Sequence, residues 1–251
     1  MSDLRAFFDE LSAAARAITL GAPVPVADNK AGAGDYDPVT ELDRATERVL
    51  RAAIEARFPE DGIEGEEYGL VRANARRRWL IDPIDGTRAL ICGLPSWTTL
   101  VALLEDGEPV AGFIDAPVLD ELMVAAGGET ALGGTALKTS GCASLADARL
   151  ATTDYHLLGP GMAPFDRVRR EARVTRYGLD ALAYARVASG HIDLVIENGL
   201  KPHDWAALVP VVRGAGGVVG NWRGGSDLSG GDVVAAATQA LFDQAVTILQ
   251  R

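Results

Sequence analysis

Cysteine and histidine are scarce in this sequence of 251 residues. There are two cysteines, Cys92 and Cys142, and three histidines, His156, His191 and His203. Two cysteines are too few for a disulfide framework or a zinc site, so a reducing compartment is expected. The histidines lack the close spacing of metal-ligating pairs, so any bound metal is expected to be held by carboxylates.

An excess of positive charge is also missing. The 24 lysine and arginine residues stand against 35 aspartate and glutamate residues, which gives a net charge of −11. Nucleic acid is therefore not an expected partner, because its phosphate backbone requires basic surfaces. A small phosphorylated substrate is still compatible with an acidic protein if bound divalent cations locally reverse the sign of the field.

Long hydrophobic runs are absent as well. No apolar stretch approaches the roughly 18 residues that can span a bilayer. The first residues do not form a basic segment followed by an apolar core, which would mark a signal peptide. We therefore expect no membrane partner and a cytoplasmic location.

Hydrophobic residues nevertheless make up 48% of the chain, enough for a sizeable core. From apolar periodicity and turn residues, helices are predicted at residues 4–18, 37–58, 87–91, 164–172, 179–189, 204–212 and 238–250. Strands are predicted at residues 79–81, 97–104, 109–114, 121–126, 149–153, 174–177, 191–197, 218–219 and 233–237. The polar, glycine-rich residues 29–36 are predicted as a mobile loop.

Two carboxylates follow closely after an apolar run in the first half. Residues 79–81 are predicted to end a buried strand, and Pro83 fixes the backbone directly after Asp82. Asp82 and Asp85 are therefore expected to leave the sheet together and to reach one point. Two carboxylates at one point can hold hard cations.

Gly86 and Thr87 come next, where a short helix can begin. Their backbone N–H groups can then cradle an anion. An anion site beside paired carboxylates indicates metal-bridged phosphate chemistry. The alternative is a plain turn in which Asp85 is only a helix N-cap. The density of acids, hydroxyl, glycine and proline in this loop favours the metal site.

Two further acidic residues are candidates for the same site. Thr40 and Asp43 have the spacing of a capping box, which predicts a structural role for Asp43 at the start of a helix. Its functional alternative is a pairing with Thr87 that orients a water molecule. Glu66 lies in the acidic segment 62–67, which is either solvated surface or the source of a third metal-binding carboxylate.

The character of the predicted elements changes near the middle of the chain. A hairpin signal at residues 106–107 indicates antiparallel sheet before the change, and strands alternate with helices after it. Glycines at 127–134 and small residues at 139–144 mark the expected boundary. We expect an N-terminal α+β subdomain of residues 1–138 with the main metal site, and a C-terminal α/β subdomain of residues 139–251 that completes it.

Several motifs lie in order along nearly the whole chain. They are residues 37–43, 65–67 and 79–87, and Asp204 at a helix start followed by glycines 214, 216 and 217. Together they resemble the inositol monophosphatase-like superfamily of metal-dependent phosphatases. Within it, residues 85–97 and 189–204 look most like the bacterial histidinol-phosphate phosphatases.

This resemblance implies a layered αβαβα sandwich, with an antiparallel sheet in the first half and a mixed sheet in the second. It also implies a homodimer and two or three Mg²⁺ ions per active site. By match to the family motifs, the implied metal ligands are Glu66, Asp82, Asp85, Asp204 and the backbone carbonyl of Ile84.

The resemblance also implies the other roles at the site. Asp43, Thr87 and Glu66 would be catalytic, with the first two positioning the attacking water. The amides of Gly86 and Thr87 would hold the phosphate. The residues implied to border the leaving group are Arg88, Asp180, Asp193 and Glu197.

Three of the four leaving-group residues have a stated structural alternative. Asp180 can cap a helix, Asp193 can be a solvent-facing strand residue, and Arg88 can pair on the surface. Acidic partners suit an amino alcohol with an imidazole better than they suit a neutral polyol. Many relatives have tryptophan where His203 precedes Asp204, and this difference argues against specificity for inositol.

The leading hypothesis is therefore a Mg²⁺-dependent phosphomonoesterase that hydrolyses L-histidinol phosphate in histidine biosynthesis by means of a metal-activated water. One alternative keeps the chemistry but changes the substrate to inositol 1-phosphate or to a broad range of small phosphates. A further alternative is a non-catalytic binding or regulatory protein on the same fold.

Overall fold

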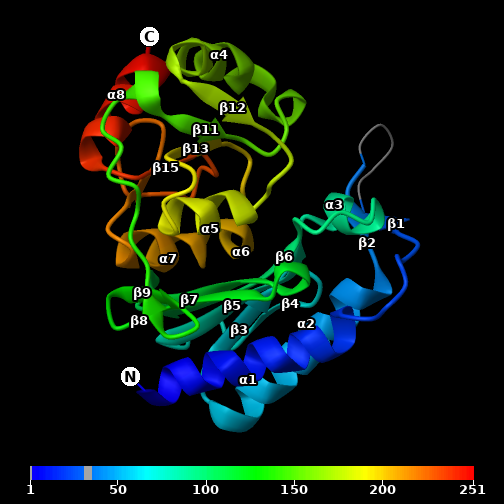
Figure 1. Cartoon of the computed structure of the whole chain (residues 1–251). Helices are drawn as coiled ribbons and strands as arrows, with labels where there is room; N and C mark the ends of the chain where they lie inside the picture. Colours follow the sequence, from blue (N-terminus) through cyan, green and yellow to red (C-terminus); the bar gives the residue numbers. More distant parts are fainter. Residues whose placement is uncertain (1, 31–35) are drawn as a thin grey trace.

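The computed structural model describes residues 2–30 and 36–251, and its elements form five layers (Figure 1). The outer layers are α1 (Ser2–Thr19) with α2 (Glu41–Arg57), and α4 (Met162–Glu171) with α8 (Gln239–Leu249). The central layer consists of α5 (Leu182–Ala188), α6 (Pro202–Trp205) and α7 (Leu208–Gly214). One sheet lies on each side of this central layer, which confirms the predicted αβαβα fold.

The first sheet has eight strands in the order β10-β9-β8-β7-β6-β5-β3-β4. These are β3 (Gly62–Gly65), β4 (Gly69–Val71), β5 (Arg77–Asp85), β6 (Thr98–Glu105), β7 (Glu108–Ala116), β8 (Glu121–Ala126), β9 (Glu129–Leu132) and β10 (Thr135–Ala136). Neighbouring strands are antiparallel except β3 and β5, which are parallel. The strands predicted in this half are antiparallel as expected, and the parallel pair involves β3, which was not predicted.

The glycine-rich residues 127–134 lie in the β8, β9 and β10 edge of this sheet. Gly127 and Gly128 have positive φ and connect β8 to β9, and Gly133 and Gly134 do the same between β9 and β10. Two-residue hairpin turns require positive φ, which glycine adopts without steric cost. These glycines therefore mark tight turns inside the sheet.

The second sheet has five strands in the order β12-β11-β13-β15-β14. These are β11 (Arg149–Ala151), β12 (Val174–Arg176), β13 (Leu194–Glu197), β14 (Val218–Gly220) and β15 (Val233–Ala236). Strand β11 is parallel to β12 and β13, whereas β15 is antiparallel to β13 and β14. The predicted mixed sheet is confirmed.

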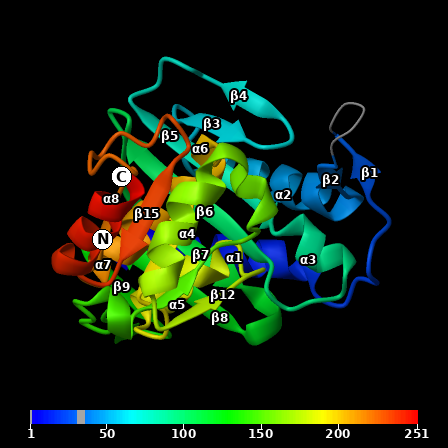
Figure 2. The ribbon, with the colours of Figure 1, turned by 90° about the horizontal axis from the view of Figure 1, so that it is seen from above.

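Shorter elements lie near one end of the first sheet. The two-residue strands β1 (Asp28–Asn29) and β2 (Pro38–Val39) pair with each other and lie beside α3 (Thr87–Ile91), as both ribbon views show (Figure 2). Three 3-10 turns are Pro117–Leu119, Leu145–Asp147 and His156–Gly161. Most of the predicted mobile loop 29–36 lies outside the described residues, which omit 31–35.

The predicted helix over residues 204–212 is two helices in the structure. Helix α6 ends at Trp205 and α7 begins at Leu208. Pro210 explains the interruption, because it has no N–H to donate to the carbonyl of Ala206 and its ring crowds that carbonyl.

Strand β5 contributes to two hydrophobic cores. Trp79 and Ile81 pack with residues of α1 and α2, whereas Leu80 packs with the central helices. Full burial of an aliphatic side chain such as Ile81 contributes about 1.5–3 kcal/mol to stability. Because side chains alternate along a strand, Asp82 follows Leu80 on the face toward the central helices.

None of the helices among the described residues is long and apolar enough to cross a membrane.

Candidate active site

A β-bulge brings Asp82 and Asp85 to the same side of the first sheet. Asp82 pairs with Leu100 of β6 and Asp85 with Thr98, so β5 advances three residues where β6 advances two. In a regular strand, side chains three residues apart point to opposite faces, and the extra residue of a bulge reverses this. The strand therefore continues to Asp85, and the prediction that it ends at Ile81 was wrong.

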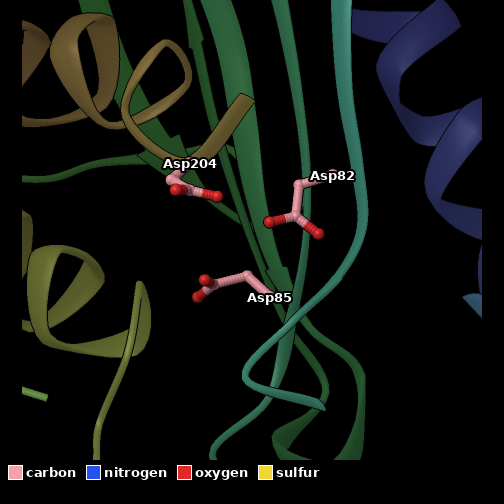
Figure 3. A group of neighbouring side chains, drawn as sticks. All are labelled: Asp82, Asp85 and Asp204. Carbon is pink, nitrogen blue, oxygen red and sulfur yellow. The ribbon is translucent and has the colours of Figure 1, made fainter. Parts of the chain in front are cut away.

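Asp204 meets this pair from the other half of the chain. One carboxylate oxygen from each of Asp82, Asp85 and Asp204 lies within 4.8 Å of the other two. Figure 3 shows the three side chains converging from β5 and from α6, which packs against β5 and β6. Asp204 is oriented by the N–H of Lys201 (2.6 Å to Oδ2), and Asp85 by the N–H of Ala181 (2.6 Å to Oδ2).

Burial and repulsion between carboxylates both raise the pKa values in this cluster. Burial raises the pKa of Asp82 and of Asp85 well above the ordinary value, and the neighbouring carboxylates raise both further. Burial also raises the pKa of Asp204. A divalent cation among these oxygens would offset the repulsion, and an all-oxygen donor set suits a hard ion. These three residues therefore fit a metal site.

Asp43 makes both of the contacts considered from the sequence, the helix cap and the pairing with Thr87. Its Oδ2 accepts hydrogen bonds from the N–H (2.7 Å) and the hydroxyl (2.5 Å) of Thr40, which completes a capping box at the start of α2. Its Oδ1 lies 3.2 Å from Oγ1 of Thr87, which is also 3.1 Å from the carbonyl oxygen of Ile84. Burial raises the pKa of Asp43 despite the hydrogen bonds from Thr40.

Glu66 lies beside the cluster but is turned toward a lysine. Lys30 donates to Glu66 (2.8 Å) and to Glu67 (2.6 Å). Burial lowers the pKa of Lys30, but these two carboxylates raise it more, so the ammonium stays charged. This side of the site thus already holds a cation beside Glu66. No local pattern in the sequence marks Lys30, because both of its partners lie more than 30 residues away.

Gly86 must be glycine at the start of α3. Its φ is +85°, and a Cβ there would lie 3.0 Å from Oδ2 of Asp180 and 3.3 Å from Cα of Trp97. The first N–H groups of a helix have no partner within the helix, and Gly86 and Thr87 line the same cavity as the carboxylate cluster. The local geometry is thus suited to an anion held next to the cluster.

One cavity of about 370 Å³ joins these groups, a size in the ordinary range for small-molecule sites. It is lined by Glu66, Asp82, Ile84, Asp85, Gly86, Thr87, Arg88, Asp154, Asp180, Tyr184, Glu197 and Asp204, among others. Asp180 and Glu197 line the same cavity as the carboxylate cluster, and Oδ2 of Asp180 lies 3.0 Å from the Cβ position of Gly86. All predicted site residues except Asp43 and Asp193 line it directly.

Asp180 and Glu197 have raised pKa values. Burial raises the pKa of Asp180 to about 6, although Arg88 lowers it. Burial raises the pKa of Glu197 to about 7, against hydrogen bonds from Thr153 and Tyr184. Glu197 is buried, Asp180 is half-buried, and Asp180 also raises the pKa of Glu197, so a cationic group beside them would be favoured.

Asp193, which was predicted to border the leaving group, does not line this cavity. It lies outside the cavity and is buried, with Arg149 donating from Nε (2.7 Å), Nη2 (2.7 Å) and the backbone N–H (2.8 Å). Ser140 donates a further hydrogen bond to it (2.5 Å). Asp193, directly before β13, therefore holds the start of β11 and the segment around Ser140 in place. Its solvent-facing alternative was wrong.

Asp154 was missed from the sequence. It lines the cavity, and its Oδ2 lies 4.0 Å from Nη1 of Arg88, whose Nη2 also donates to the carbonyl of Tyr36 (2.6 Å). Arg88 is thus paired near the surface, as its structural alternative predicted, while it also lines the cavity. An isolated aspartate in a loop carries no motif, so only the fold reveals it.

Converging carboxylates, a carboxylate–hydroxyl pair and an anion cradle in one cavity are the features of a phosphatase that uses metal ions. The chain belongs to the inositol monophosphatase family, whose sequence model matches residues 4–251. The family resemblance inferred from the motifs is confirmed.

Individual relatives carry different names. A bifunctional phosphatase, IMPL2, of Arabidopsis thaliana is 43% identical over 194 residues, which cover 76% of this chain but 56% of the plant protein. A histidinol-phosphatase of Chlorobaculum parvum is 36% identical over 82% of this chain and 81% of its own length. A solved inositol monophosphatase from Zymomonas mobilis superposes with a TM-score of 0.88, at 40% identity, over 100% of this chain and 98% of that chain.

Proposed function

We propose that this protein is a Mg²⁺-dependent phosphomonoesterase that hydrolyses L-histidinol phosphate to L-histidinol and phosphate. The observation that carries the proposal is the layout of the cavity. The carboxylates of Asp82, Asp85 and Asp204 gather in it, and Asp180 and Glu197 also line it. We assign Asp180 and Glu197 to the wall that faces the leaving group. A phosphate with a cationic alcohol attached would pair with metal ions held by the first three acids and with the carboxylates of this wall.

In this proposal the metal ligands are Asp82, Asp85, Asp204, Glu66 and the carbonyl of Ile84. Glu66 is available once its contact with Lys30 is exchanged, and the carbonyl oxygen of Ile84 has a second lone pair beside the one facing Thr87. Bound Mg²⁺ would make a coordinated water more acidic and would neutralise charge that develops on the phosphoryl oxygens.

The remaining residues direct the water and the phosphate. Asp43 accepts a proton at Oδ1, through the hydroxyl of Thr87 that lies 3.2 Å away. The cap formed by Thr40 holds that carboxylate in place. The N–H groups of Gly86 and Thr87 bind phosphate oxygens, which orients the phosphorus for in-line attack.

Substrate choice rests on the leaving-group wall. An amino group and an imidazolium would pair with the carboxylates of Asp180 and Glu197, and the ion pairs would keep both acids ionised near neutral pH. Asp154 is a third acid at the same rim. Inositol offers hydroxyls only and would leave these acids without a cation, which favours the histidinol ester.

The first test is phosphate release by the purified protein with L-histidinol phosphate and with inositol 1-phosphate, each with Mg²⁺ and with a chelator. We expect chelator-sensitive turnover that strongly favours histidinol phosphate. Equal or reversed preference would leave the metal site standing and reject the substrate. Turnover of neither compound would favour a non-catalytic binding or regulatory role.

Two variants test whether Asp180 and Glu197 determine the preference for histidinol phosphate. Glu197→Gln and Asp180→Asn remove one negative charge each from the leaving-group wall and leave its shape almost unchanged. We expect both to raise KM for histidinol phosphate about tenfold or more, and to change KM for inositol 1-phosphate little. Similar effects on both substrates would contradict the assignment of this wall.

We also propose that the protein forms a homodimer. A groove on the N-terminal half is lined by exposed apolar side chains, among them Leu20, Val24, Leu94 and Val118. Exposed apolar patches are typical of interfaces between subunits. Light scattering on the purified protein tests this proposal, and a monomer at micromolar concentration would reject it.

A further inference from the structure

Glu47 is a fully buried acid of α2 that the mechanism leaves without a role. Its Oε2 accepts a hydrogen bond from the N–H of Glu67 (2.7 Å), and its Oε1 accepts one from the N–H of Tyr68 (3.2 Å). Both donors belong to the turn of residues 66–68 that follows β3, and Glu66 is the first residue of that turn. Two charge-assisted hydrogen bonds to consecutive backbone groups fix the course of a turn.

The charge of Glu47 is balanced within the same helix. Arg51, one turn further along α2, donates from Nε to Oε1 of Glu47 (2.6 Å). Its Nη2 donates to the carbonyl of Gly69 at the end of the same turn. A buried carboxylate that has a cation partner and two N–H donors is fully satisfied, so the side chain has a single defined position.

Gly65 makes this close approach possible. A Cβ at residue 65 would lie 2.0 Å from Oε1 and 2.3 Å from Cδ of Glu47, so a larger residue would displace the carboxylate. On the other side, the N–H of Glu66 donates to the carbonyl of Ile81 in β5 (3.2 Å). The backbone at Glu66 is thus held between α2 and the strand that carries Asp82.

We propose that Glu47 is a positioning residue that sets the metal affinity of the site through Glu66. The proposal rests on the proposed function, in which Glu66 is a metal ligand. Asp43 and Glu47 lie four residues apart on one face of α2, so one rigid helix orients both the residue that takes the proton and the turn that supplies a ligand. Removal of such outer-shell partners typically weakens metal binding about 10- to 100-fold.

The test compares Mn²⁺ binding, measured by electron paramagnetic resonance, in the wild-type chain and in variants. Glu47→Gln keeps the shape but can accept from only one of the two N–H groups. Glu47→Asp keeps the charge beside Arg51 and cannot reach both amides. The matched control is Glu55→Gln, which removes a glutamate of the same helix that pairs with Arg72 at the surface (3.1 Å).

We expect Mn²⁺ to bind at least tenfold more weakly to both Glu47 variants and within twofold of wild type to the Glu55 variant. The Mg²⁺ concentration for half-maximal phosphate release should rise in parallel, with kcat largely restored at saturating Mg²⁺. A purely structural role would instead lower the thermal unfolding midpoint in chelator and leave both metal measurements unchanged.

The inference about Glu47 and the proposed function would be contradicted by different results. If the wild-type chain binds Mn²⁺ and releases phosphate, but both Glu47 variants bind Mn²⁺ within twofold of it, the inference about Glu47 is wrong and the proposed function stands. If the wild-type chain itself neither binds Mn²⁺ nor releases phosphate, the proposed function falls and the inference falls with it.

Discussion

The hydroxyl of Thr87 lies 3.2 Å from Oδ1 of Asp43, and the other oxygen of the same carboxylate caps helix α2 through Thr40. Thr87 belongs to α3 and Asp43 to α2, so this contact joins the two helices at the edge of the cavity. A residue that looks structural in the sequence is thus also placed to accept a proton.

Variants of Asp43 and Thr40 distinguish the catalytic role proposed for Asp43 from its role in capping the helix. Asp43→Asn should lower kcat at least about 100-fold, because general-base assistance is typically worth that much or more. Thr40→Ala should cost about 1 kcal/mol in the free energy of unfolding, since it removes the cap, and should keep most of the activity. Phosphate release and urea unfolding measure the two effects. Equal losses of activity would mean that Asp43 acts only through the helix.

Asp82→Asn tests the carboxylate cluster. The variant should lose turnover while staying folded, and in chelator it should be more stable than wild type, because a buried and repelled carboxylate is gone. Mg²⁺ at about 100 times its Kd should stabilise the wild-type chain by about 2.7 kcal/mol and the variant much less. Thermal unfolding with and without Mg²⁺ measures this difference. Near-normal turnover would contradict the proposed site.

Substitution of Asp193 should lower stability and leave substrate binding unchanged. Asp193→Asn weakens the hydrogen bonds from Arg149 and Ser140, and should lower the free energy of unfolding by about 2 kcal/mol. Because Asp193 lies outside the cavity, KM for histidinol phosphate should not change. Urea unfolding and steady-state kinetics check both statements. A higher KM at unchanged stability would return Asp193 to the leaving-group wall.

Glu197 should make stability depend on pH in a defined direction. Burial raises its pKa from 4.5 to about 7 in the folded chain. Between these values the unfolded chain loses the proton and the folded chain keeps it, so stability falls as the pH rises through this window. The loss is on the order of 3 kcal/mol for this residue.

The other buried acids of the site shift stability in the same direction, so the comparison with Glu197→Gln isolates this residue. Urea unfolding in chelator at about pH 5 and about pH 8 should show a smaller drop for the variant than for wild type. An equal drop in both would mean that the proton of Glu197 does not distinguish the folded from the unfolded state.

Local signals in the sequence were sufficient for elements whose boundaries are set by their own residues. Strand β8 and helix α3 have the predicted limits, and the hairpin at residues 106–107 joins β6 to β7 as expected. The bulge in β5 was not predictable from periodicity, because it is defined by the register against β6. Apolar runs and turn residues do not report which strand is the partner.

The site residues also divide into those that local motifs mark and those whose roles depend on distant partners. Asp82, Asp85 and Asp204 were found because motifs mark them, and the structure brings them together. Glu47 satisfies backbone groups some 20 residues away, and its own neighbourhood in the sequence looks like an ordinary charged helix. The ion pair of Asp193 could not be predicted from the sequence, because its partner Arg149 lies 44 residues away. The contacts of Glu47 and Asp193 are therefore set by partners that are distant in the sequence.

A metal ion bound in the carboxylate cluster would also affect the rate at which the chain unfolds. Its members come from β5 and from α6, and Ala181 reaches Asp85 across 96 residues of sequence. An ion bound there would have to be released before the layer of α6 could separate from the first sheet, so it would slow unfolding as well as favour the folded state. During synthesis, the ion-binding centre cannot close until α6 has left the ribosome, which makes it a late step in maturation.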